Sequence, residues 1–199
     1  MYSYISGKIA DKATNYVVID NNGIGYKIFM SQTAIEKLPY VGENQKVYTY
    51  YYVREDNISL YGFLSNEELR MFELLLSVSG IGAKSAIQIL SNITPSSFAL
   101  AVITNDISAI VKIPGIGKKT AERMILELKD KLKTEQAINK DNKIEQAIIE
   151  DNKDNEAISA LQVLGYTRKE IEKALEKIEL QNLSVEEIIR KALNVLGNN

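Results

Sequence analysis

Two stretches of the 199-residue chain combine a glycine-rich turn with basic residues in the same order. "SGIGAKSAIQIL" spans residues 79–90, "PGIGKKTAERMI" spans residues 114–125, and both continue into a helical pattern. Backbone N–H groups at the start of a helix point outward, and the helix dipole favours an anion there. A lysine two residues after the second glycine adds a full positive charge beside these groups. The repeat therefore predicts two turns that bind phosphate.

The residues expected to contact phosphate are the glycines and the basic side chains of both turns. They are Gly80, Gly82 and Lys84 in the first turn, and Gly115, Gly117, Lys118, Lys119 and Arg123 in the second. Glycine allows positive φ and a close approach by another backbone. The first turn has Ala83 and Gln88 where the second has two further basic side chains. Its grip should therefore depend more on backbone amides.

Binding of this kind holds phosphates without reading base edges, so it should be independent of sequence and sensitive to salt. The alternative is that Gly-Ile-Gly marks only a turn between two helices. Charge favours binding: residues 80–133 carry eight Lys/Arg and four Asp/Glu, whereas residues 1–79 carry seven and nine and residues 134–199 nine and thirteen. Two aligned copies in the one basic segment predict DNA binding.

The composition excludes several kinds of chemistry. The chain has no cysteine and no histidine, which rules out disulfides, thiolate and imidazole catalysis, and zinc sites built from these residues. "GIGKKT" resembles the end of a nucleotide-binding loop, but Lys119 occupies the position of the Ser or Thr that must reach magnesium. We expect no metal, no cofactor, no catalytic residue and no ATP hydrolysis by this chain.

The sequence also lacks the patterns of membrane insertion. No apolar run is long enough to span a bilayer, and "MYSYISGKIA" has neither the basic start nor the apolar stretch of a signal peptide. We therefore expect a cytoplasmic protein with no membrane partner.

Residues 1–63 contain β-branched and aromatic runs separated by Gly, Asn and Asp, a pattern typical of short strands. The five runs are "YISGKIA", "NYVVID", "GIGYKIFM", "KVYTYYYV" and "ISLYGF". Between the third and the fourth, "SQTAIEKL" has a short helical period with Ser31 as its N-cap. Five strands with one helix after the third predict a Greek-key β-barrel of the OB type. Another small β-barrel or sheet is the alternative.

From Asn66 onward the hydrophobic period changes to that of helices. Short amphipathic segments fill residues 64–133, and Pro95 and Pro114 stand at their joints, where they break no helical hydrogen bond. Residues 134–155 are polar, rich in charge and poor in aromatic residues, as in a flexible linker.

Helical periodicity returns at residues 156–199. Three helix-sized segments follow one another here, and Thr167 and Ser184 are placed as N-caps. A compact three-helix module is the simplest way for so short a segment to bury its leucines and isoleucines. The whole chain is thus predicted to be a multidomain β + α protein.

The paired turns resemble helix-hairpin-helix units, which bind DNA independently of sequence. With "YYVREDNISLYGF", "SGIGAKSA" and "PGIGKKTAERMILELKDKL", the whole chain resembles the RuvA family. The resemblance implies an N-terminal OB-type β-barrel, a central all-α tandem helix-hairpin-helix domain, a flexible linker and a C-terminal three-helix module similar to ubiquitin-associated domains. Their expected limits are residues 1–63, 64–133, 134–155 and 156–199.

The same resemblance implies a function. The chain would be a non-catalytic subunit that recognises four-way Holliday junctions, holds them open, and recruits and stimulates a RuvB-type ATPase ring for branch migration in recombination and DNA repair. Its partners would be four-way junction DNA and its duplex arms, the ATPase ring, and further copies of itself in a homotetramer, with one or two tetramers on a junction.

Two further sets of residues take a role from the resemblance. Glu55 and Asp56, between the fourth and fifth strand runs, would form an acidic pin at the centre of the tetramer and repel phosphates without cleaving DNA. Leu161, Leu164 and Tyr166, around "LGY", would be candidate contacts of the motor. By themselves the acids indicate a solvated turn, and "LGY" indicates packing between helices.

Two other function classes fit the sequence less well. A helix-hairpin-helix DNA-repair glycosylase shares the turn type but needs a lysine nucleophile or a catalytic aspartate in a pocket. Lys118 and Lys119 fit phosphate contact instead, and Asp130 stands late on an exposed-looking helical stretch. A simple DNA-binding adaptor explains the turns, but not the barrel with its acidic tip or the C-terminal module.

Overall fold

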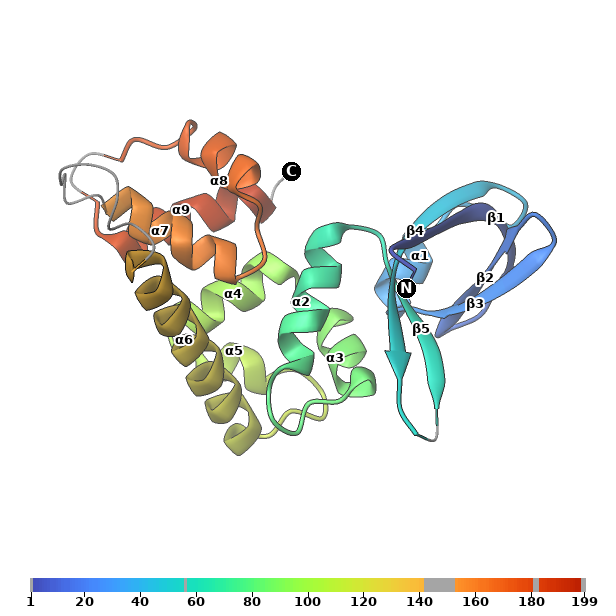
Figure 1. Cartoon of the computed structure of the whole chain (residues 1–199). Coiled ribbons are helices and arrows are strands. Elements are labelled where there is room, and N and C mark those ends of the chain that lie inside the picture. The colour runs from blue at the N-terminus through green and yellow to red at the C-terminus, as the bar shows by residue number, and fades with distance from the viewer. Residues whose placement is uncertain (1, 56, 142–152, 181–182, 198–199) are drawn as a thin grey trace. The chain divides into compact units, whose positions relative to one another are not determined.

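The computed structural model describes residues 2–55, 57–141, 153–180 and 183–197 (Figure 1). The chain forms two compact units. The first comprises residues up to 73 together with 82–92, and the second comprises residues 74–81 together with 93–199.

The N-terminal part of the first unit is a closed five-stranded barrel. Its neighbours run in the order β1-β2-β3-β5-β4, with β3 and β5 parallel and the other pairs antiparallel. The strands are β1 (Tyr4–Lys12), β2 (Tyr16–Asn21), β3 (Ile24–Phe29), β4 (Asn44–Val53) and β5 (Ile58–Phe63), and helix α1 (Gln32–Lys37) connects β3 to β4. The predicted barrel, with its helix after the third strand, is confirmed.

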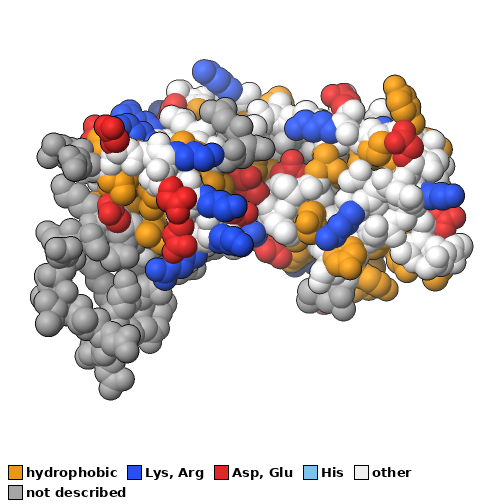
Figure 2. All heavy atoms as spheres, turned by 90° about the horizontal axis from the view of Figure 1, so that it is seen from above, with side chains coloured by type: hydrophobic (Ala, Val, Ile, Leu, Met, Phe, Trp, Pro, Cys, Tyr) orange, Lys and Arg blue, Asp and Glu red, His pale blue; other side chains and the backbone are white. Residues whose placement is uncertain are grey.

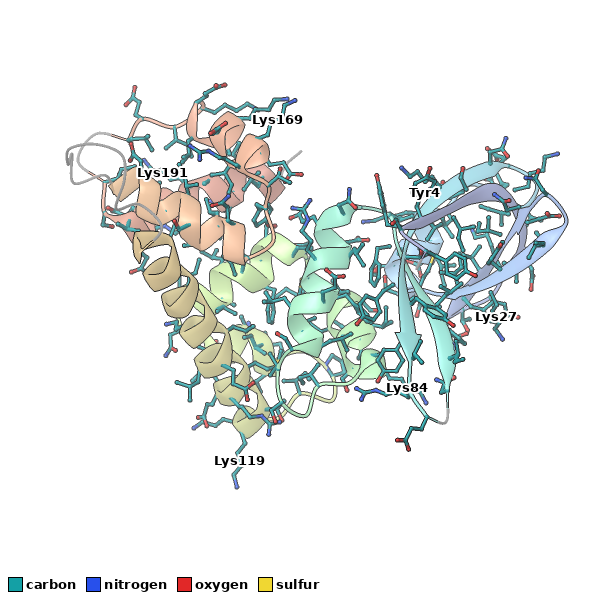
Figure 3. All side chains as sticks on the ribbon, viewed as in Figure 1. Tyr4, Lys27, Lys84, Lys119, Lys169 and Lys191 are labelled. Atoms are coloured by element: carbon teal, nitrogen blue, oxygen red, sulfur yellow. The ribbon has the colours of Figure 1, made fainter. Side chains whose placement is uncertain are left out.

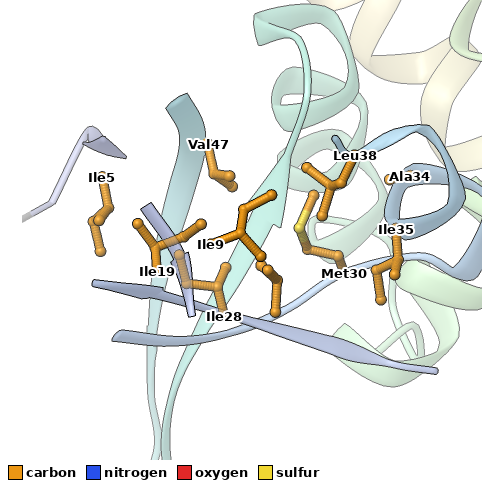
Figure 4. Packing of buried hydrophobic residues seen from close by; sticks show 10 residues of the cluster. Ile5, Ile9, Ile19, Ile28, Met30, Ala34, Ile35, Leu38 and Val47 are labelled. Atoms are coloured by element: carbon orange, nitrogen blue, oxygen red, sulfur yellow. The ribbon is translucent and has the colours of Figure 1, made fainter. Parts of the chain in front are cut away.

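Alternating apolar side chains fill the barrel. Val17, Ile19 and Ile28 are fully buried, and their neighbours along each strand face outward, as the two-residue period of a strand requires. Figure 4 shows strand residues and α1 residues directed into one core. Ser31 caps α1 as expected, because its hydroxyl accepts the Ala34 N–H at 3.2 Å. The cap fixes the point where α1 closes over the core.

Helix α2 (Asn66–Leu76) is attached to the barrel by aromatic packing. Phe72 is fully buried, and its ring centroid lies 5.3 Å from Tyr50, 5.3 Å from Tyr61 and 4.9 Å from Phe63. Contacts of this kind between large apolar rings contribute strongly to stability. The barrel therefore holds the helix that leads into the first glycine turn.

The remaining helices follow the 3.6-residue pattern of the sequence. They are α3 (Ala83–Leu90) in the first unit, and α4 (Pro95–Ile103), α5 (Ile107–Val111), α6 (Lys118–Asp141), α7 (Lys153–Val163), α8 (Arg168–Leu175) and α9 (Val185–Gly197) in the second. Pro95 begins α4 behind the N-cap Thr94, and Pro114 lies in the turn before α6. Both prolines occupy joints, as predicted.

Helix α6 is longer than expected. It continues to Asp141, whereas the linker was expected to begin at residue 134. Residues 142–152, the middle of that expected linker, lie outside the described residues. The domain limits stated above stay predictions.

The three predicted C-terminal helices are present as α7, α8 and α9. Thr167 forms a capping box with Glu170 at the start of α8, and the Ser184 hydroxyl accepts the Glu187 N–H at 3.3 Å before α9. The predicted β + α fold class is thereby confirmed. Within the described part of the chain, no single helix has the length and apolar composition to cross a membrane.

Candidate nucleic-acid interface

The first glycine turn connects α2 to α3. Gly80 has φ +80°, and the Ile81 N–H donates to the Val78 carbonyl at 3.1 Å. Val78 and Ile81 are both buried, so their side chains anchor the turn to the apolar interior. Gly82 is the N-cap of α3 in extended backbone, and its carbonyl accepts the Ala86 N–H at 2.9 Å. Gly82 offers no side chain to the free N–H groups that follow it.

The second turn, between α5 and α6, repeats this geometry. Gly115 has φ +83°, and the Ile116 N–H donates to the Ile113 carbonyl at 3.1 Å. Ile113 and Ile116 are buried, and the Gly117 carbonyl accepts the Ala121 N–H at 3.0 Å. The two aligned stretches of sequence therefore fold into the same backbone structure.

The two glycines of each turn do different things. Only the first of each pair, Gly80 or Gly115, has positive φ. Around Gly82 and Gly117, a side-chain Cβ would have no heavy atom within 4 Å. Open space beside the N–H groups of a helix start is suited to a closely approaching phosphate. The positive-φ argument from the sequence therefore holds for one glycine in each pair, and the close-approach argument fits the other.

All three predicted lysines are exposed at the helix starts. Lys84 follows the first turn, and Lys118 and Lys119 follow the second. Figure 3 labels Lys84 and Lys119 at these two turns. Lys118 Nζ lies 3.9 Å from a Glu122 carboxylate oxygen, but both side chains are largely in water, so the pair is weak. Ala83, at the position of Lys118 in the first turn, is buried. The second turn thus carries more positive charge than the first.

Arg123 follows the second turn in the sequence, but its side chain contacts the first turn, which the sequence did not reveal. A Cβ built at Gly80 would lie 2.7 Å from an Nη atom of Arg123, so the guanidinium of α6 lies directly against the first turn. One helical turn further along α6, the Glu127 carboxylate accepts the Ser79 N–H at 2.9 Å. Gly80, Ser79, Arg123 and Glu127 all belong to the second unit. Glu127 was missed because nothing in its local sequence shows which distant turn it faces.

Helix α5, which leads into the second turn, has a charged N-cap. The Asp106 carboxylate accepts the Ala109 N–H at 3.0 Å and the Ser108 hydroxyl at 2.6 Å. The hydrogen bonds from Ser108 and Ala109 lower the pKa of Asp106 below its ordinary value of 3.8. The ionised carboxylate therefore stabilises the short helix that positions the turn.

The residues on either side of the acidic tip between β4 and β5 are hydrogen-bonded to each other. The Arg54 N–H donates to the Asn57 carbonyl at 2.8 Å, and the Arg54 Nε donates to the Tyr52 hydroxyl at 2.8 Å. Glu55 is exposed at the tip, and Asp56 lies outside the described residues. The role of these two acids as a pin stays a prediction.

The three candidate motor contacts lie inside the C-terminal module. Leu161, Leu164 and Tyr166 are at most 5% exposed. Their burial favours packing between helices over direct contact, and contact with a motor stays a prediction.

The exposed face of this module carries charge: Figure 2 shows basic and acidic side chains close together on the C-terminal helices. Among the described residues, no group of three or more acidic side chains could hold a metal ion.

A five-stranded barrel followed by two matching glycine turns defines a tandem helix-hairpin-helix protein with an N-terminal barrel. The family comparisons agree with each part. The RuvA N-terminal domain matches residues 1–62, the SAM-like helix-hairpin-helix tandem matches residues 72–130, and the RuvA C-terminal domain matches residues 152–197.

Full-length relatives give the same result. The chain is 48% identical over 200 residues to the Holliday junction branch migration complex subunit RuvA of Acetivibrio thermocellus, covering 99% of both chains. It is 46% identical over 196 residues to the protein of that name from Clostridium botulinum, and 47% identical over 200 residues to that from Clostridium perfringens, covering 98% of this chain and 99% of each relative. The chain belongs to the RuvA family.

Proposed function

We propose that this chain is a non-catalytic DNA-binding subunit that recognises four-way Holliday junctions and supports their branch migration by a separate RuvB-type ATPase. The observation that carries the proposal is the pair of glycine turns with the same backbone geometry. Each turn presents helix-start N–H groups beside open space, with an exposed lysine after the second glycine. The relatives are named as subunits of a Holliday junction branch migration complex, and this name supports the four-way junction as the DNA that is bound.

The chemistry proposed for the turns is electrostatic. Backbone N–H groups of the turn and helix start donate to phosphate oxygens, and Lys84, Lys118 and Lys119 neutralise the charge. None of these groups reads a base edge, so the turns hold a duplex arm of any sequence. Two turns in one chain can hold two phosphates of the same arm, and a homotetramer would bring one such pair to each of the four arms.

The barrel and the C-terminal module complete the proposal. In a tetramer, four copies of Glu55 and Asp56 would gather at the crossing point and repel the phosphates there, which holds the strands apart. The C-terminal module would bind the ATPase ring. Neither a glycosylase nor a simple adaptor gains support, because the three family matches cover the barrel, the turns and the module together.

The direct test is a titration of four-way junction and linear duplex of equal length, with native mass spectrometry of the complexes. We expect tighter binding of the junction, in complexes that contain four or eight copies of the chain. Equal affinity for both DNAs, or binding by a monomer, would contradict junction recognition.

The proposed motor contact needs a separate test. A chain that ends after Asp141 should bind junctions like the full chain but should no longer stimulate the RuvB-type ATPase. Junction binding by the short chain is the internal control for folding. If the short chain still drives branch migration, the C-terminal module does not bind the motor.

A further inference from the structure

We propose that Glu127 is a positioning residue that sets the first glycine turn for phosphate binding, so that the helix of the second hairpin controls the first. This inference rests on the proposed DNA binding and deepens it. It assigns to Glu127 no contact with DNA. The residue acts through the backbone N–H of Ser79, 48 positions away in the sequence.

The geometry joins α6 to the first turn at two adjacent points. Glu127 accepts the Ser79 N–H at 2.9 Å, and the guanidinium of Arg123 lies against Gly80. Arg123 and Glu127 are four residues apart, so they lie on the same face of α6. Glu127 is half-buried and Arg123 is exposed. One face of α6 thus holds two consecutive residues of a turn that belongs to the other hairpin.

The second turn shows what the hydrogen bond achieves. In the aligned repeats, Pro114 stands at the position of Ser79. Proline lacks a backbone N–H, so the second turn needs no acceptor at this position. The pyrrolidine ring of Pro114 also fixes φ, which restricts the backbone there. In the first turn, Ser79 has a free backbone rotation about φ and an N–H that needs an acceptor. Glu127 accepts this N–H and thereby restricts the backbone. The two turns reach the same hydrogen-bonding pattern by different means.

The position of a carboxylate here is otherwise unfavourable. A negative charge beside a phosphate-binding turn repels the ligand, and its removal by itself should strengthen binding. The positioning role predicts the reverse result for a variant that lacks the acceptor. The two effects have opposite signs, which makes the inference testable.

The experiment measures the affinity of the full-length chain for a four-way junction at fixed salt. Glu127→Ala removes the acceptor and the charge, whereas Glu127→Gln removes the charge and keeps an oxygen that can accept the Ser79 N–H. We expect Glu127→Ala to bind roughly three- to tenfold more weakly, as for the loss of a typical intramolecular hydrogen bond. Glu127→Gln should bind at least as well as the unaltered chain.

A second variant tests the mechanism independently of overall stability. Ser79→Pro copies the second turn into the first and removes the N–H that Glu127 satisfies. In the double variant Ser79→Pro/Glu127→Ala, binding should return to the level of Ser79→Pro alone. A merely structural role for Glu127 in α6 would leave the double variant as weak as Glu127→Ala, and that result would overturn the proposal.

Two further outcomes are informative. If both Glu127 variants bind more tightly than the unaltered chain, the carboxylate acts only by repulsion and the positioning role is wrong. Lys119→Ala, measured in parallel, separates DNA binding by the turns from positioning of the first turn by Glu127. If Lys119→Ala weakens binding and Glu127→Ala does not, the turns bind DNA as proposed but Glu127 does not position the first turn. If neither change alters the affinity, the chain does not use the turns to bind DNA.

Discussion

At the scale of single residues, the two glycines of a Gly-Ile-Gly turn can be separated by experiment. Gly115 needs its positive φ, and Gly117 does not, although both have open space around a would-be Cβ. A side chain at the first glycine strains the backbone, whereas one at the second occupies the space beside the helix-start N–H groups. Stability and binding should therefore respond to different members of the pair.

The matched variants are Gly115→Ala and Gly117→Ala. Gly115→Ala should lower the free energy of unfolding by about 1–2 kcal/mol, because alanine disfavours the left-handed conformation. Gly117→Ala should leave the unfolding free energy within about 0.5 kcal/mol, as for an unstrained exposed site, yet weaken junction binding. Thermal unfolding and junction titration measure the two effects. Normal junction binding by a folded Gly117→Ala chain would show that no phosphate approaches this glycine.

At the scale of the elements, α5 depends on a charged cap. The lowered pKa of Asp106 means that its carboxylate contributes stability fully above the ordinary value of 3.8, and that this contribution is lost as the pH falls through the lower pKa of the folded chain. Asparagine can cap the same helix without titrating. The difference between the two residues should therefore depend on pH.

We expect the unaltered chain to unfold at a higher denaturant concentration than Asp106→Asn at neutral pH. This advantage should be constant down to about pH 5 and should shrink below about pH 4, where the carboxylate of the unfolded chain is protonated. Glu187, whose pKa is also lowered by hydrogen bonds from Ser184, is present in both proteins and cancels in the comparison. A difference that stays constant from pH 7 to 3 would contradict the assigned role of the Asp106 charge.

The elements also show what could be predicted from the sequence. The barrel strands and the glycine turns follow from period, turn residues and caps, all of which are local signals. Helix α6 continues through "TEQAINKD", whose polar composition suggested a linker, because this stretch contains no Gly or Pro and consists largely of acceptable helix formers. The bond from Ser79 to Glu127 was not predictable, since no local pattern pairs segments 48 residues apart.

At the scale of the whole molecule, the chain separates its charges. Basic residues are concentrated in residues 80–133, and acidic residues exceed basic ones on both sides of that segment. In the proposed tetramer, the acidic tips would meet phosphates only where strands cross, whereas the lysines would hold the arms. Junction selectivity would then come from repulsion at the centre as much as from attraction along the arms.

Changing Glu55 and Asp56 together to asparagine tests this idea. If the two acids form a pin, affinity for linear duplex should rise and the preference for the four-way junction should shrink. If they are only a solvated turn, affinity and stability should change by no more than about 0.5 kcal/mol. The measurement is the ratio of junction to duplex affinity at fixed salt, and an unaltered ratio would return both residues to the role of a surface turn.

The central claim is that the paired turns hold DNA through phosphates, and the salt dependence of junction binding tests it most directly. The logarithm of affinity should fall linearly with the logarithm of salt concentration. Changing Lys118 and Lys119 together to alanine removes two charges from each copy, so for a bound tetramer this slope should become less steep by up to about 7, for every DNA sequence tested. As a control, Lys169 and Lys191, labelled in Figure 3 on the C-terminal module, are changed to alanine in a second variant, which should keep the original slope. Equal slopes for all three proteins, or a loss of affinity confined to one DNA sequence, would contradict the account.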